Sequence, residues 1–129
     1  MEKRKIKNSN IRISKLSFGT SALGDMPDTY GYSVDEGRAR ETINAIFESE
    51  CNLIDTSRNY GFGNAEKRIG QVIQERGGLP DDFVISTKLD RDMKTQKFDA
   101  TRARKSIEES LDALNVDSIG LLHLHVPEH

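Results

Sequence analysis

The stretch LIDTSRNYGFGNAEKRIG, residues 53–70, decides the fold because it joins a short apolar segment to a polar loop and then to a helical pattern. Leu53 and Ile54 are predicted to end a buried strand, and Asp55 follows them directly. Tyr60 lies further on, in a loop rich in glycine. In α/β proteins, functional sites form at the carboxyl ends of the strands. The stretch therefore predicts a carboxylate at a strand end and a tyrosine on the loop that follows.

Outside this stretch, strand and helix patterns alternate along the chain. Strands are predicted at residues 15–20, 53–55, 83–88 and 119–125, after a polar hairpin formed by residues 4–7 and 11–13. Helices are predicted at residues 35–50, from an N-cap at Asn64 to the glycines at 77–78, and from Asp99 or Thr101 to Asn115. Residues 21–34 are predicted to form a loop. This order predicts an α/β fold with right-handed crossovers and a parallel sheet.

The composition excludes several classes of function. The 129 residues carry a formal net charge of −2 with acids and bases interleaved, so no basic stripe indicates nucleic-acid binding. The sequence has no apolar run of about 18 residues, and the basic N-terminus does not continue into the apolar segment of a secretory signal. Cys51 is the single cysteine, so no internal disulfide can form. We therefore expect a cytoplasmic protein that binds no membrane.

Three of the predicted strands end in a reactive side chain. These are Asp55, Lys88 and His125, and Tyr60 follows the first of them on its loop. Because side chains alternate between the two faces of a strand, each strand can turn an apolar set toward the helices and its polar end toward the other face. The residues predicted to pack against helices are Ile54, Phe83, Ile85, Thr87, Leu122 and Leu124.

These four side chains suit the delivery of a proton to a carbonyl oxygen. A tyrosine, with a free pKa of about 10, is a poor acid at neutral pH, and a neighbouring ammonium such as that of Lys88 favours its phenolate. Asp55 would hold that ammonium charged and oriented, and a neutral imidazole at His125 can hydrogen-bond the carbonyl. No activated serine or cysteine is evident. The group that attacks the carbon would therefore be a hydride from a bound cofactor.

Each of these signals has a purely structural alternative. An aspartate at a strand end is often a cap or an ion-pair partner, a strand-end lysine is often a solvated charge, and Tyr60 could anchor its loop by packing. His123 is predicted to be a hydrogen-bonded histidine of the core. Together with His125 and His129 it could bind a metal, but no fourth ligand is indicated, so no metal site is assigned.

The chain resembles the N-terminal part of the aldo-keto reductases through four segments. These are LSFGT at 16–20, residues 55–70, ISTK at 85–88 and VDSIGLLHLHVP at 116–127. The second resembles the signature D-T-A-x-x-Y-G-x-x-E-x-x-[IL]-G, with one extra residue before Glu66. The fourth places the family's histidine on His125, and not on His123. The loop from Gly24 to Val34 resembles that of the bacterial sugar-dehydrogenase branch, which includes D-threo-aldose and L-fucose dehydrogenases.

The resemblance implies the N-terminal half of a (β/α)₈ TIM barrel. Residues 1–14 would plug its floor, and residues 15–129 would supply its first four strands with three helices. It also implies that NADP or NAD binds without a Rossmann motif, and no G-x-G-x-x-G occurs in the sequence. The implied activity is an oxidoreductase that reduces carbonyls, or oxidises sugars or alcohols, by hydride transfer.

The resemblance also implies a role for each site residue. Tyr60 would be the general acid and base, Lys88 and Asp55 would tune it, and His125 would orient the substrate carbonyl. Three residues match family positions near the nicotinamide and its ribose: Gly19, Thr20 and Asp55.

The length of the chain sets a further expectation. A (β/α)₈ barrel takes about 250 residues, whereas this sequence stops just after the fourth predicted strand. We therefore expect a truncated product or a fragment whose open edges are covered by self-association or by another chain. The alternative to an enzyme is a non-catalytic reductase-like subunit or interaction module.

Overall fold

Four parallel strands form the sheet of the computed structural model, which describes residues 1–125. They are β3 (Phe18–Gly19), β4 (Leu53–Asp55), β5 (Val84–Leu89) and β6 (Leu121–Leu124), hydrogen-bonded in that order. Each strand pairs with the next one along the chain, as successive parallel crossovers require. The predicted α/β fold with a parallel sheet is therefore confirmed.

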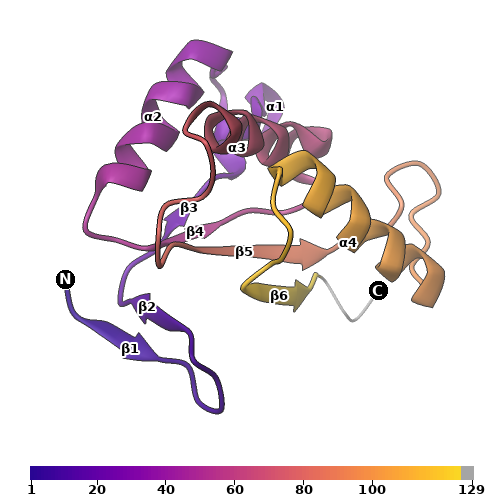
Figure 1. Cartoon of the computed structure of the whole chain (residues 1–129). Coiled ribbons are helices and arrows are strands. Elements are labelled where there is room, and N and C mark those ends of the chain that lie inside the picture. The colour runs from indigo at the N-terminus through magenta and orange to yellow at the C-terminus, as the bar shows by residue number, and fades with distance from the viewer. Residues whose placement is uncertain (126–129) are drawn as a thin grey trace.

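Three helices connect the successive strands and lie on the same face of the sheet (Figure 1). They are α2 (Glu36–Glu48), α3 (Asn64–Glu75) and α4 (Ala100–Leu114). Helices on one face alone are expected for the wall of a barrel, since the other face then points inward. None of the helices within residues 1–125 has the length and apolar content needed to cross a bilayer.

Side-chain caps begin two of these helices. Asp35 accepts a hydrogen bond of 2.8 Å from the backbone N–H of Arg38, and Asp99 accepts one of the same length from Arg102. The predicted N-cap at Asn64 is wrong, because Asn64 is already helical and Gly63 precedes it in a left-handed conformation. The Asn64 side chain instead donates to the carbonyl of Gly24 at 3.0 Å.

The hydrophobic core lies between the sheet and its helices. Its buried members come from α2, α3, the end of α4 and the helix-facing side of the strands: Ile43, Ile46, Phe47, Ile54, Ile69, Val72, Ile73, Phe83, Ile85 and Leu114. The prediction that these strand residues face the helices is confirmed: Ile54, Phe83 and Ile85 belong to the core cluster with residues of α2 and α3, and the Thr87 hydroxyl donates to Glu66 of α3. Gly70 allows the closest approach of α3 to α4, since a Cβ there would lie 1.8 Å from the carbonyl oxygen of Ala113.

The N-terminal hairpin is held at the amino ends of the parallel strands. It consists of β1 (Lys3–Lys5) and β2 (Arg12–Ser14), and Asn52, just before β4, attaches it. The Asn52 amide accepts from the N–H of Ser14 at 2.7 Å and donates to the carbonyls of Arg12 and Asp82. The hairpin therefore lies at the opposite end of the sheet from the predicted site (Figure 1).

The structure also differs from the sequence-based expectations in the segment that follows β3. Residues 21–34 contain two short helical segments, η1 (Ser21–Gly24) and α1 (Pro27–Tyr30). Proline at the first position of α1 and a left-handed Gly31 after it are typical helix start and stop signals.

Leu122 and Leu124 do not pack against helices as predicted, because they are 41% and 51% exposed. The reason is that β6 is an edge strand and α4 packs on its neighbour β5.

Candidate active site

An ion pair joins the ends of the two central strands. Lys88 Nζ on β5 lies 3.0 and 3.1 Å from the two carboxylate oxygens of Asp55 on β4, and it also donates to the carbonyl of Thr56 at 2.6 Å. The Lys88 side chain is 13% exposed and that of Asp55 is 33% exposed. The pair is therefore held in a fixed geometry while the carboxylate stays accessible from the open face.

Tyr60 lies over this pair at the start of the turn η2 (Tyr60–Gly63). Lys88 Nζ is 4.9 Å from the centroid of its ring, within the range of a cation–π contact. Gly61 fixes the loop after Tyr60, since its φ is +61° and a Cβ there would lie 2.2 Å from the carbonyl oxygen of Gly24. The close backbone contact between Gly61 and Gly24 thus places the phenol beside the ammonium.

His125 completes the set from the end of β6. Its ring is perpendicular to that of Tyr60, with 6.2 Å between the centroids, and its backbone N–H donates to the carbonyl of Leu89 at 3.2 Å. The structure thus brings Asp55, Tyr60, Lys88 and His125 to one edge of the sheet. Their catalytic roles stay predictions. Residues 126 and 127 of the family-like segment, and His129, lie outside the described residues.

His123 is not the core histidine that the sequence predicts. It is exposed, because it lies on the face of the sheet that carries Ser86 and Asp55, opposite to the hydrophobic core. Its Nδ1 lies 3.1 Å from Ser86 Oγ, and that hydroxyl donates to Asp55 at 2.9 Å. Within residues 1–125 no cluster of histidine, cysteine and carboxylate side chains is arranged to hold a metal ion.

Gly19 and Thr20 lie directly beside Asp55. Gly19 pairs with Asp55 in the sheet, and a Cβ at Gly19 would meet nothing within 4 Å. Thr20 is fully buried, and both its N–H and its hydroxyl donate to the Asp55 carbonyl, at 3.0 and 2.9 Å. Gly19 thus presents bare backbone beside the accessible carboxylate, while Thr20 fixes the main chain beneath it. Their contact with a cofactor stays a prediction.

Sequence reasoning missed Asp90, which is 3% exposed and follows β5 directly. Its carboxylate contacts the hydroxyl of Ser57 and the Nδ1 of His125, and it accepts from the N–H of Asn59 at 3.1 Å. In the sequence, Asp90 is marked only by its place just after the strand predicted at residues 83–88. Its position two residues after Lys88, at the same sheet edge, is the signal that could have identified it.

A second group of charges lies on the helix side of the sheet. Glu66 of α3 is fully buried, accepts from Arg58 at 2.7 Å and accepts from the hydroxyl of Thr87 at 2.7 Å. Burial raises the pKa of Glu66, against the opposing effect of its hydrogen bonds. Glu109 of α4 shows the opposite direction, because its hydrogen bonds from Arg102, at 2.8 and 3.2 Å, lower its pKa.

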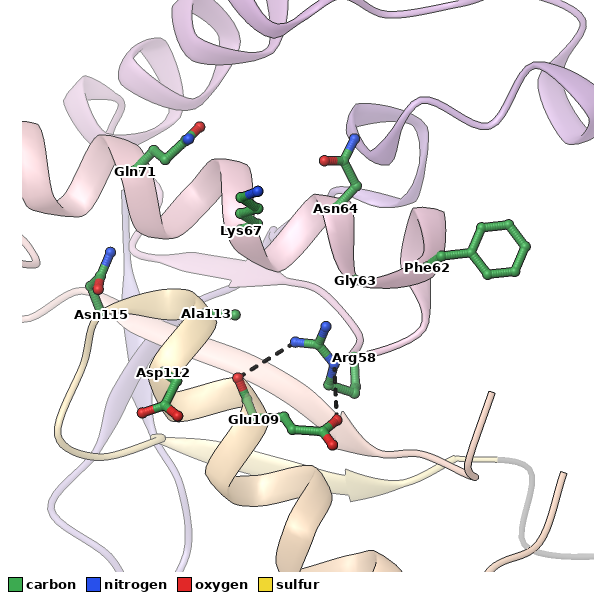
Figure 2. A pocket seen from close by; sticks show the side chains of 10 residues that line it. All are labelled: Arg58, Phe62, Gly63, Asn64, Lys67, Gln71, Glu109, Asp112, Ala113 and Asn115. Atoms are coloured by element: carbon green, nitrogen blue, oxygen red, sulfur yellow. Dashed lines mark hydrogen bonds and ion pairs between the residues drawn. The ribbon is translucent and has the colours of Figure 1, made fainter. Parts of the chain in front are cut away.

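A surface groove of about 680 Å³ lies between α3 and α4 and is lined by none of the four predicted side chains. Figure 2 shows Arg58 directed toward Glu109 within it, while the ring of Phe62 points away. The groove is therefore lined by the charged helix surfaces. The predicted site is instead a set of side chains at the carboxyl edge of the sheet.

These features define the class of protein: one side of a β/α barrel with an aspartate–lysine pair, a tyrosine and a histidine at the carboxyl edge of its strands. Residues 15–129 match the Aldo/keto reductase family, and the chain belongs to that family. The resemblance drawn from the four sequence segments is therefore confirmed.

Known relatives carry dehydrogenase and reductase names. L-Galactose dehydrogenase of Arabidopsis thaliana is 34% identical over 125 residues, which are 97% of this chain and 38% of that protein. D-threo-Aldose 1-dehydrogenase of a Pseudomonas species is 28% identical over 144 residues, covering 93% of this chain and 42% of that protein.

Among solved structures, the holo form of an aldo-keto reductase from Bacillus halodurans superimposes with a TM-score of 0.76 at 26% identity. The match covers 96% of this chain and 40% of that one. The chain thus spans about two fifths of the length of the proteins it matches.

Proposed function

We propose that this chain supplies the proton-transfer side of an NADP- or NAD-dependent oxidoreductase that reduces carbonyls, or oxidises sugars or alcohols, by hydride transfer. Membership of the family and the dehydrogenase names of its relatives support this proposal. The observation that carries it is the position of Lys88 Nζ, 3.0 Å from the Asp55 carboxylate and 4.9 Å from the centre of the Tyr60 ring.

In the reduction direction, Tyr60 gives its proton to the carbonyl oxygen while that carbon gains a hydride, so that C=O becomes CH–OH. The Lys88 ammonium stabilises the phenolate that remains, and Asp55 keeps the ammonium in place. His125 lies at the edge of the Tyr60 ring and hydrogen-bonds the substrate oxygen: as the imidazolium it donates to the carbonyl, and as the neutral ring it accepts from the hydroxyl of the alcohol. Oxidation of an alcohol reverses these transfers.

The residues present fit a nicotinamide cofactor at this edge. The space beside Gly19 is open, and the neighbouring Asp55 carboxylate is one-third exposed. When bound, the cofactor would supply or accept the hydride, and Gly19 and Asp55 would contact it. A reducing compartment such as the cytoplasm is part of the proposal, and the free, buried thiol of Cys51 is consistent with it.

Fluorescence titration of NADPH and of NADH with the chain tests the proposal. We expect saturable binding, and we expect Tyr60→Phe to retain that binding while turnover falls by about 10²- to 10⁴-fold, the usual contribution of a general acid. Tyr32→Phe is the matched control, because Tyr32 is an exposed tyrosine of the α1–α2 loop and should leave both quantities unchanged. Absence of binding would refute the enzymatic proposal for this chain, and full turnover in Tyr60→Phe would refute the assignment of the acid.

We further propose that the chain self-associates through the outer edges of its sheet. Within residues 1–125, β3 and β6 each pair on one side only, and large apolar side chains near them are exposed: Leu16, Phe18, Leu122 and Leu124. Unpaired strand edges with exposed apolar residues favour pairing with another chain. Light scattering after size exclusion should show a mass above 14.5 kDa that falls on dilution. A monomer across the whole concentration range would refute self-association.

A further inference from the structure

The main chain of Asp90 is fixed by α4. Its N–H donates to Ser106 Oγ at 3.1 Å, and its carbonyl accepts from Arg102 Nε at 3.3 Å. The side chain is 4% exposed and points toward the edge where the predicted site residues meet. A carboxylate held this rigidly can set the orientation of a neighbouring group.

Both oxygens of this carboxylate have a partner. Oδ2 accepts from the hydroxyl of Ser57 and from the N–H of Asn59, and Oδ1 contacts His125 Nδ1. A carboxylate is an acceptor only, so the hydrogen between Asp90 and His125 belongs to Nδ1. Ser57 Oγ also lies 3.4 Å from Nδ1, but its one proton is directed to Asp90.

The same carboxylate links two parts of the predicted site. Asn59 directly precedes Tyr60, so its hydrogen bond to Asp90 ties down the loop that carries the phenol. His125 approaches the carboxylate from β6, on the far side of β5 from that loop's strand β4. Asp90 therefore fixes the imidazole and the start of the tyrosine turn relative to each other.

We propose that Asp90 is the positioning residue of His125. It keeps the neutral imidazole as the Nδ1–H tautomer, so that Nε2 accepts a hydrogen bond from the hydroxyl of an alcohol or sugar substrate. This inference rests on the proposed function, because it concerns the same site. It also refines the substrate class. With its hydrogen fixed on Nδ1, the neutral ring can only accept at Nε2, which suits a hydroxyl group, and this ring can donate from Nε2 to a carbonyl only as the imidazolium.

The tautomer can be measured directly in the full chain. Two-bond ¹H–¹⁵N correlation spectra of the histidine rings should be recorded well above the usual titration range of histidine, where the rings are neutral. We expect His125 to show a protonated Nδ1 and an unprotonated Nε2. A protonated Nε2 in the unmodified chain overturns the proposal, whether or not any variant folds.

Asp90→Asn sharpens the test, because the amide can donate to Nδ1 as well as accept from it. We expect the single Nδ1–H tautomer to be lost in this variant and restored, at least in part, by Asp90→Glu. Asp117→Asn, at an exposed position between α4 and β6, is the matched control and should leave the His125 spectrum unchanged. An unchanged tautomer in Asp90→Asn overturns the proposal.

The measurement needs neither cofactor nor turnover. A failure of the oxidoreductase proposal therefore shows separately, as absent cofactor binding.

Discussion

The two faces of the β3–β6 sheet carry opposite kinds of side chain, although they alternate along the same strands. On the helix-covered face, Ile54 and Ile85 are 0% and 2% exposed and belong to the hydrophobic core. On the other face, Asp55 and Lys88 form an ion pair that remains partly exposed. Because side chains alternate along a strand, one face of the sheet contributes to the hydrophobic core and the other carries the candidate site.

The charges on the two faces differ in the same way. Behind the sheet, the carboxylate of Glu66 is fully buried and hydrogen-bonded to Arg58 and Thr87, so it has little capacity to bind a ligand. Lys88 and Asp55 also form hydrogen bonds, but the Asp55 side chain is 33% exposed, and Lys88 lies over the ring of Tyr60. A buried charge pair therefore does not by itself indicate a functional site. The Lys88–Asp55 pair differs from the Arg58–Glu66 pair because its carboxylate is accessible and a phenol lies next to its lysine.

The largest expected effect comes from truncating one residue of each face at adjacent positions of β4. Ile54→Ala should lower the free energy of unfolding by about 2 to 5 kcal/mol, because it removes a fully buried side chain from the core. Leu53→Ala removes the same number of carbon atoms from a half-buried side chain on the open face. It should lower the free energy of unfolding by about 1 kcal/mol. Urea unfolding of both variants, with the slope checked for equality, measures the difference.

Equal losses for the two variants would contradict the contrast between the faces. If the losses are equal only at high protein concentration, a second copy of the chain buries Leu53. Repeating the unfolding at low concentration distinguishes this case from a true equality of the two faces.

The local patterns of the sequence were enough to predict most of the fold. Helical patterns over residues 35–50, and from Asp99 or Thr101 onward, predicted α2 and α4, and the structure shows Asp35 and Asp99 as their caps. The convergence of Asp55, Lys88 and His125 also followed from the sequence, because parallel strands bring their carboxyl ends to one edge.

The features that the sequence did not predict depend on contacts between distant segments. Asp90 acquires its role only through His125, 35 positions away along the chain, and no local pattern marks that pair. The exposure of Leu122 and Leu124 depends on whether a helix covers β6. The alternation of side chains within the strand does not predict this. The prediction for His123 was wrong for a related reason. Its neighbours in the sequence are apolar, which indicated the core, but its side chain lies on the exposed face of the sheet.

A smaller effect is expected from the two glutamates on the helix side, whose pKa values shift in opposite directions from the usual value near 4.5. Burial raises the pKa of Glu66, so as pH rises above that value the unfolded chain loses this proton before the folded one does, and stability falls. Hydrogen bonds from Arg102 lower the pKa of Glu109, so its contribution is present above the usual value and is lost as pH falls through the lower folded value.

Unfolding midpoints between about pH 3 and pH 7 can separate the two glutamates. Glu66→Gln should remove the decline in stability that begins above the usual glutamate pKa, and Glu109→Gln should remove part of the loss that begins below it. Each variant is the control for the other, because both replace a carboxylate that pairs with an arginine by an amide of the same size. If both variants change the dependence of stability on pH in the same direction, the prediction is wrong. The difference in exposure between Glu109, 34% exposed, and the fully buried Glu66 would then not set the direction of their pKa shifts.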